Sequence, residues 1–336
     1  MEQVQRVLQN LIDWGDVPGL AIQVNCKGKV RMQKGFGLAD IDTERMVHPG
    51  LTQFRAGSIS KPITATALNV LLQEGIIDLE EKVSHFVPEF RYSEVSIRNL
   101  VGHTSGIRSY RGKELLSNAP ISALESLVLF KDDPLMFAPS SDFLYSTYNF
   151  VLLALAIERA TGEPFETLVR NRVLAPLGMN MTAPEVPESP FAGCSQFYSR
   201  DSSGFNLATP VDNRYKLGGG GYLTTVVDLC LLGQSYVDQY LRNEPAADSF
   251  LQPQQLNGQW VPYGLGWQLA PINAKRRYFG HDGTGIGGFG SFYVFPDLEL
   301  VIALLFNCTR PKIQEQLSIT LEHICTTAER DWLQEK

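Results

Sequence analysis

Residues 20–36 read LAIQVNCKGKVRMQKGF, and this stretch decides the fold. It contains two runs, Leu20–Cys26 and Val30–Phe36, in which apolar and β-branched residues recur as they do in half-buried strands. Lys27-Gly28-Lys29 separates the runs, and a short connection that contains glycine is typical of a β-hairpin. The N-terminal part of the chain is therefore predicted to supply two antiparallel strands.

The opposite end of the chain repeats this pattern. Ser291–Phe295 is followed by the turn Pro296-Asp297 and by a second strand-like run, Glu299–Phe306. A helical tail follows from about Pro311. The two ends together predict one antiparallel sheet built from both termini and flanked by helices.

The middle of the chain is mostly helical in its hydrophobic pattern. The predicted helices are a segment through Ile63, Ala67, Val70 and Leu71 that closes at Gly75, then Ala123–Phe130, Asn149–Ala160 and Val226–Tyr240. We expect an α+β fold in a single domain of residues 1–336, with a sheet lobe (about 1–57 and 260–336) beside a mainly helical lobe (about 58–259). A cleft between the lobes is the expected place for a site.

Composition narrows the classes of function. The 336 residues carry a net charge of -7 and no basic run, which argues against nucleic acid or an anionic membrane as a partner. The five cysteines are widely spaced without a Cys-x-x-Cys pair, so we expect neither a disulfide framework nor a zinc site. Residues 1–14 have helical spacing rather than a signal-peptide pattern, which predicts a cytoplasmic protein unless a leader was removed, and no run is long enough to span a membrane.

Ser58-Ile59-Ser60-Lys61 is the first candidate catalytic motif. A serine hydroxyl becomes a good nucleophile when a neighbouring base takes its proton, and residues three apart on a helix share one face. Burial would lower the pKa of Lys61 toward a value that suits a base. Pro62 disfavours helical geometry at the residue before it, so we expect a distorted helix start. The same spacing also suits an N-cap serine followed by a solvated lysine.

Two further motifs follow in the chain. Tyr145-Ser146-Thr147 precedes the predicted buried helix, and a nearby ammonium would lower the pKa of the Tyr145 phenol for proton transfer. His281-Asp282-Gly283-Thr284 leads into a glycine-rich strand, where a substrate can approach the backbone. Taken singly, the first also suits a core aromatic residue and the second an ordinary turn.

In this order the three motifs resemble the serine β-lactamase and penicillin-binding protein superfamily, in particular its class C β-lactamase and esterase branch. The resemblance extends nearly end to end. The sequence around Ser58, Phe86–Phe90 and Tyr145–Thr147 is especially similar to the mitochondrial β-lactamase-like serine hydrolases and their bacterial relatives. The further stretches that carry it are Gly57–Pro62, Gly75–Asp78, Phe86–Phe90, Gly102–Gly106, Leu174–Thr182, Gly219–Leu229, Tyr263–Trp267 and Gly280–Asn307. The resemblance implies a β-lactamase/transpeptidase-like fold.

The resemblance also implies a role for each motif residue. Ser58 would be the nucleophile, Lys61 its base or proton store, and Tyr145 the acid/base that protonates the leaving group. The backbone N–H groups of Ser58 and Thr284 would form the oxyanion hole. The substrate-binding residues would be Thr147, His281, Gly283 and Thr284.

Two of these positions depart from the β-lactamase pattern. Thr147 stands where those enzymes usually have an asparagine that contacts the acyl amide, and His281 stands where many have a lysine that attracts the substrate carboxylate. Both changes weaken the expectation of efficient β-lactam turnover and leave acyl-enzyme chemistry intact.

Other functional interpretations agree less well with the sequence. Gly285–Gly290 matches Gly-x-Gly-x-x-Gly, but a strand follows it and no βαβ unit contains it, which argues against a dinucleotide site. No serine lies in a Gly-x-Ser-x-Gly elbow, and no histidines have metal-ligand spacing; His103 is expected to be a structural turn residue.

The sequence therefore predicts a serine hydrolase of a small amide or ester, with a small molecule or short peptide as substrate and with no cofactor or metal. A D-alanyl-D-alanine carboxypeptidase or penicillin-binding protein is one alternative. A non-catalytic scaffold on the same fold is another, since fold does not fix function.

Overall fold

A computed structural model describes residues 1–188, 192–244 and 249–334 of the chain. Its centre is a seven-stranded sheet with the order β11-β12-β13-β14-β1-β2-β3, in which every neighbouring pair is antiparallel. The strands are β1 (Gly19–Cys26), β2 (Lys29–Asp40), β3 (Arg45–Met46), β11 (Gln268–Leu269), β12 (Phe279–Gly285), β13 (Gly288–Phe295) and β14 (Leu300–Phe306).

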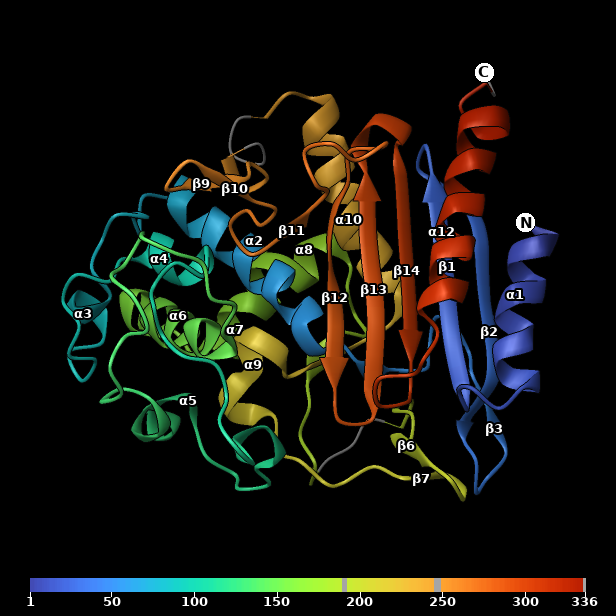
Figure 1. Cartoon of the computed structure of the whole chain (residues 1–336), viewed down its shortest axis with the longest axis horizontal. Coiled ribbons are helices and arrows are strands. Elements are labelled where there is room, and N and C mark those ends of the chain that lie inside the picture. The colour runs from blue at the N-terminus through green and yellow to red at the C-terminus, as the bar shows by residue number, and fades with distance from the viewer. Residues whose placement is uncertain (189–191, 245–248, 335–336) are drawn as a thin grey trace.

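The two ends of the chain meet in the middle of this sheet. Strand β1 pairs with β14, so that Leu20 lies opposite Phe306 and Cys26 opposite Leu300. The two predicted hairpins, β1–β2 and β13–β14, are thus neighbours (Figure 1). This arrangement confirms the predicted α+β class with an antiparallel sheet from both termini.

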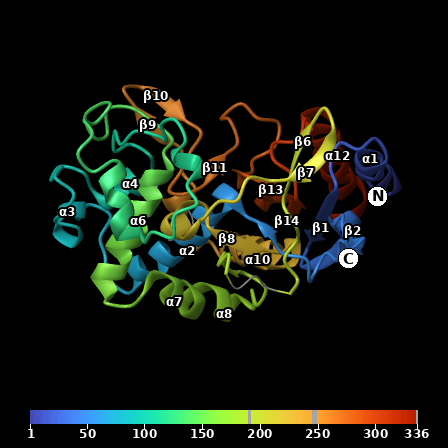
Figure 2. The same cartoon turned by 90° about the horizontal axis from the view of Figure 1, so that it is seen from below.

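Successive side chains of a strand point to opposite faces of the sheet, so the central strands contribute to two separate hydrophobic cores. Leu300, Ile302 and Leu304 of β14 pack beneath α1 (Glu2–Asp13) and α12 (Gln314–Thr327). Val301 and Leu305 point to the opposite face, toward the helices of the middle segment. Figure 2 shows α10 on that opposite side of the sheet from α1 and α12. Because both faces are covered, every residue of β1 and β14 is buried.

Helices fill the middle of the chain and lie beside strand β12 (Figure 1). The longest are α2 (Ser60–Gln73), α6 (Thr147–Thr161) and α10 (Val226–Leu241), as the sequence predicts. The shorter ones are α3 (Val83–Phe86), α4 (Ile97–Val101), α5 (Ala123–Ser126), α7 (Phe165–Val169), α8 (Ala175–Leu177) and α9 (Leu217–Gly220). The predicted helix Ala123–Phe130 is wrong in part: α5 gives way to a 3₁₀ turn, Leu127–Leu129, and ends there.

Short strands that the sequence did not predict connect the larger elements. They are β4 (Phe54–Arg55), β5 (Ala183–Pro184), β6 (Tyr198–Asp201), β7 (Gly204–Leu207), β8 (Tyr222–Thr224), β9 (Gln254–Leu256) and β10 (Gln259–Val261). Strand β8 lies between β4 and β5 and holds the segment that leads into Ser58. The glycine-rich stretch is the β12–β13 hairpin, where Gly285 pairs with Gly288.

Within the described ranges, no helix combines the length and the apolar character that crossing a membrane requires.

Candidate active site

Ser58 lies at the turn that connects β4 to α2. It occupies a single 3₁₀ turn, Gly57–Ile59, and the chain becomes α-helical from Ser60. Pro62 falls in the first turn of α2, where its missing N–H costs nothing because these groups have no partner inside the helix. The helix is thus preceded by a 3₁₀ turn, although Lys61 itself is helical, and the Nζ of Lys61 lies 3.1 Å from the Oγ of Ser58.

The amine of Lys61 is completely buried and has polar neighbours without any negative charge. Its Nζ donates to the carbonyl oxygen of Gly219 at 2.7 Å and lies 3.4 Å from the Oγ1 of Thr147. No carboxylate of the described ranges forms an ion pair with it. Burial lowers the pKa of Lys61 well below its ordinary value, and the charge of Lys216 lowers it further. A neutral amine beside a hydroxyl is able to accept the proton of that hydroxyl.

Tyr145 precedes α6 and lies over Lys61, whose Nζ is 4.8 Å from the centroid of the phenol ring. Burial raises the pKa of Tyr145, and a hydrogen bond with Ser58 opposes this only in part. The expected lowering of this pKa by a lysine charge is therefore wrong. Burial thus favours the protonated form of the phenol and the neutral form of the lysine, which suits Tyr145 to donate a proton.

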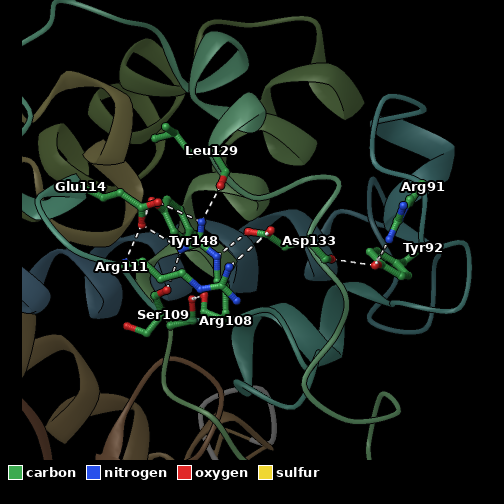
Figure 3. A network of polar contacts seen from close by, with 10 residues as sticks. Arg91, Tyr92, Arg108, Ser109, Arg111, Glu114, Leu129, Asp133 and Tyr148 are labelled. Atoms are coloured by element: carbon green, nitrogen blue, oxygen red, sulfur yellow. Dashed lines mark hydrogen bonds and ion pairs between the residues drawn. The ribbon is translucent and has the colours of Figure 1, made fainter.

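An ionic network centred on the buried side chain of Arg108 (Figure 3) holds the residues that follow Tyr145. The guanidinium of Arg108 contacts Glu114 at 2.8 Å and Asp133 at 2.5 Å. The Ser146 hydroxyl donates to the carbonyl oxygen of Arg108, and the Tyr148 hydroxyl donates to Glu114. Ser146, which follows Tyr145 directly, and Tyr148 are thus fixed to Arg108 and Glu114. Sequence patterns did not reveal this network.

His281 comes to the same place from strand β12 and is 1% exposed. Its Nδ1 lies 2.7 Å from the carbonyl oxygen of Asp282, which can only accept, so Nδ1 carries the proton and Nε2 is an acceptor. Two phenols reach that acceptor, Tyr145 at 3.4 Å and Tyr263 at 3.2 Å. Burial lowers the pKa of His281 to about 3. The histidine is therefore neutral and brings no positive charge to the site.

Strand β12 packs directly against the Ser58 turn because two glycines leave room for it. A Cβ on Gly283 would lie 2.1 Å from the carbonyl oxygen of Ala56. Gly57 has a φ of +53°, and a Cβ there would lie 2.9 Å from the backbone nitrogen of Thr284. This contact places the backbone of Thr284 beside the nucleophile turn, while its side chain is exposed. The two backbones expected to supply the oxyanion hole are thus adjacent.

His103 packs against the ring of Tyr145. It is fully buried at a φ of +58°, and its ring centroid is 4.4 Å from that of Tyr145. Its Nδ1 is 2.9 Å from the Nδ2 of Asn149 on α6. The predicted turn residue therefore also supports the face of the tyrosine ring.

A buried ion pair that the sequence did not reveal connects the Ser58 turn to strand β12. Arg55 of β4 contacts Glu185 through its Nε at 2.9 Å and donates through Nη1 to the carbonyl oxygen of Ile286 at 2.5 Å. Asn213 donates to the same carboxylate, to its Oε2, at 2.6 Å. No local motif marks such a pair, because its partners are far apart in the chain.

The chain is similar to several known proteins. A family model described as Beta-lactamase matches residues 4–321. The human protein named serine beta-lactamase-like protein LACTB, mitochondrial, is 27% identical over 93% of this chain and 75% of its own length. Penicillin-binding protein 4* of Bacillus subtilis is 27% identical over 88% of this chain and 70% of its own. The D-amino acid amidase of Ochrobactrum anthropi SV3 shares the fold, with a TM-score of 0.85, 20% identity and coverage of 97% of this chain and 99% of its own.

Proposed function

The chain belongs to the beta-lactamase family, and on that basis we propose that it is a serine hydrolase that forms an acyl-enzyme on Ser58 and hydrolyses a small amide or ester. The observation that carries this proposal is the buried Lys61 amine, which has no counter-ion among the described residues and lies 3.1 Å from the Ser58 hydroxyl. A structural lysine in this position would require a carboxylate partner. A neutral lysine beside a serine is instead the arrangement of an activated nucleophile.

Acylation begins when the Oγ of Ser58 attacks the substrate carbonyl carbon and its proton passes to the Nζ of Lys61. The negative charge that develops on the carbonyl oxygen is held by the backbone N–H groups of Ser58 and Thr284. When the bond to the leaving group breaks, Tyr145 gives its phenolic proton to that group. The proton on Lys61 then returns to Tyr145 through solvent, because the ammonium lies over the face of the phenol ring.

Deacylation uses Lys61 as the base a second time. Water attacks the acyl carbon, its proton passes to Lys61, and the carbon–oxygen bond to Ser58 breaks with return of a proton to Oγ. Neutral His281 accepts a hydrogen bond from Tyr145 and thereby orients the phenol. Gly283 keeps the strand close enough for the acyl group to lie along it.

The substrate-facing positions favour an ester or amide other than a β-lactam. Thr147 offers a hydroxyl where the β-lactamase pattern has a carboxamide, and its Oγ1 already lies 3.4 Å from Lys61. His281 is neutral where the pattern often has a lysine. The names of the relatives, which include a penicillin-binding protein, make penicillin an informative second ligand.

Intact-mass measurement after treatment with a fluorophosphonate probe tests the nucleophile. We expect one adduct on the parent protein and on Ser60→Ala, and none on Ser58→Ala. Ser60 is the matched control because it is the neighbouring buried serine. Labelling that persists in Ser58→Ala would refute the assignment, and absence of labelling in the parent would favour a scaffold.

A second measurement compares turnover of a short-chain p-nitrophenyl ester with exposure to penicillin. We expect rapid ester hydrolysis, together with a slow or persistent penicilloyl adduct. Rapid turnover of penicillin with little ester hydrolysis would overturn the preference proposed for Thr147 and His281.

A further inference from the structure

Lys216 is a second buried lysine, and its place near the site was not evident from the sequence. It ends the short 3₁₀ segment Arg214–Lys216, immediately before α9, and it is 6% exposed. Its Nζ lies 5.8 Å and 5.5 Å from the ring centroids of Tyr110 and Tyr215. Lysines buried to this degree are ordinarily paired with an anion.

Lys216 has no such partner in the part of the chain that the structure describes. The two carboxylates whose charge reaches it are Glu185 and Asp212. Glu185 is bound by Arg55 and Asn213, and Asp212 is bound by Arg214. Each nearby negative charge is thus already neutralised, so the ammonium of Lys216 is a surplus cation.

This ammonium remains accessible and charged. Its Nζ has no hydrogen-bond partner among the described residues. It is nevertheless not fully enclosed by protein atoms, so it keeps some contact with solvent. Burial lowers the pKa of Lys216 to about 8, which leaves the amine mostly protonated at neutral pH. A ligand anion that reached it would meet a positive charge flanked by two aromatic rings.

The position of Lys216 relative to Ser58 is fixed by helix α9. Gly219, three residues further on, gives the carbonyl oxygen that binds Lys61, and a Cβ on Gly219 would lie 2.6 Å from the Cγ2 of Thr147. The Tyr110 hydroxyl is near that of Thr147 without bonding to it. Lys216 therefore lies on the side of the site that Thr147 and Tyr110 form, within electrostatic reach of Lys61.

We propose that Lys216 is a specificity-determining residue that binds a carboxylate of the substrate, so that the proposed hydrolase prefers anionic esters or amides. This inference rests on the proposed hydrolase function. It assigns the anion-binding charge to a residue outside the three motifs, since His281 on β12 is neutral and Arg55 is already paired with Glu185.

Two pairs of esters test the proposal and locate the carboxylate. The first pair, p-nitrophenyl monoglutarate and its methyl ester, differs by a charge in the acyl group. The second, 4-acetoxybenzoate and its methyl ester, differs by a charge in the leaving group. The measured quantity is the ratio of kcat/KM for the anionic ester to that for the neutral ester, which cancels any effect of Lys216 on the reacting groups themselves.

We expect the ratio to fall about tenfold to a hundredfold in Lys216→Met for one of the pairs, and to be largely kept in Lys216→Arg. The pair in which the ratio falls shows whether the carboxylate belongs to the acyl or to the leaving group. An unchanged ratio in both pairs would overturn the proposal.

Binding of glutarate separates this proposal from the hydrolase function. Calorimetry on Ser58→Ala is expected to show glutarate binding that weakens at least tenfold when Lys216→Met is added. This result would support Lys216 as the anion site even if the parent protein hydrolysed none of the four esters. Equal glutarate affinity in the two proteins, or no binding to either, would overturn it.

Discussion

Lys61 and Arg108 both have buried basic side chains within the helical part of the molecule, and their surroundings differ completely. Arg108 contacts the carboxylates of Glu114 and Asp133 and the carbonyl oxygen of Leu129 (Figure 3). Lys61 contacts a carbonyl oxygen and two hydroxyls. The pKa of Arg108 is raised, chiefly by its hydrogen bond to Glu114, whereas burial lowers the pKa of Lys61.

This difference separates a structural charge from a reactive one. A buried cation with counter-ions stays charged and fixes the elements that supply them. Complete burial without a counter-ion, as at Lys61, lowers the pKa of an amine and makes it available for proton transfer. The two environments meet at Tyr145, which contacts Lys61 directly and is held through Ser146 by the backbone of Arg108.

The largest expected effect comes from replacing Lys61. Lys61→Met should lower kcat/KM for a p-nitrophenyl ester by about 10²–10⁴, because Ser58 loses its base. The free energy of unfolding should stay equal or rise, since an apolar side chain of similar length replaces an uncompensated buried amine. Steady-state kinetics and urea denaturation of the same preparation measure both quantities.

A permanent charge at position 61 provides the control for that experiment. Lys61→Arg should lose activity as Lys61→Met does and should also lose stability, because a guanidinium stays protonated without a counter-ion. Near-normal turnover in either variant would remove Lys61 from the mechanism.

The opposite result is expected for Arg108. Arg108→Met should lower the free energy of unfolding by about 2–4 kcal/mol, because Glu114 and Asp133 lose their shared buried cation. Arg111→Met is the matched control: Arg111 is mostly exposed and contacts Asp133 at 3.5 Å, so its loss should cost less than about 1 kcal/mol. Equal effects of the two replacements would show that burial of the network adds nothing.

The pH dependence of the free energy of unfolding tests the protonation state of Lys61. The pKa of Lys61 is lower in the folded protein than in the unfolded chain, so between these two values the unfolded chain binds the extra proton. The stability of the parent relative to Lys61→Met should therefore increase with pH in that interval, by up to about 1.4 kcal/mol per pH unit. Urea denaturation of both proteins between pH 6.5 and 9.5 measures this difference. A difference that is constant with pH would mean that Lys61 keeps its proton when buried.

Sequence alone predicted those parts of the site that depend on the spacing of residues close together in the chain. Ser58 and Lys61 are three residues apart, so helical geometry predicts their contact. Tyr145 and His281 were found through the order of their motifs, and their contact with each other depends on how the segment before α6 approaches β12. The direction of the Tyr145 pKa was wrong because burial, which sequence does not show, is the larger influence on the phenol.

Prediction of the fold from sequence was also limited to local features. The hairpins β1–β2 and β13–β14 follow from alternating residues around short turns, and the structure confirms them. The Arg108 network and the isolation of Lys216 were not predictable, because each depends on which distant carboxylates come near. In sequence, Lys216 cannot be distinguished from an ordinary surface lysine.

The smallest expected effect tests how Lys61 obtains its low pKa. Burial is the larger cause and the charge of Lys216 the second, so Lys216→Met should raise the pKa of Lys61 only modestly. Because the neutral amine is the base, the acid limb of the kcat/KM profile for a neutral ester should move to higher pH, by less than about one unit. Lys216→Arg keeps the charge and should leave the limb in place. A shift to lower pH would contradict a repulsive interaction between the two lysines, and a shift of several units would make Lys216, rather than burial, the main reason that Lys61 is neutral.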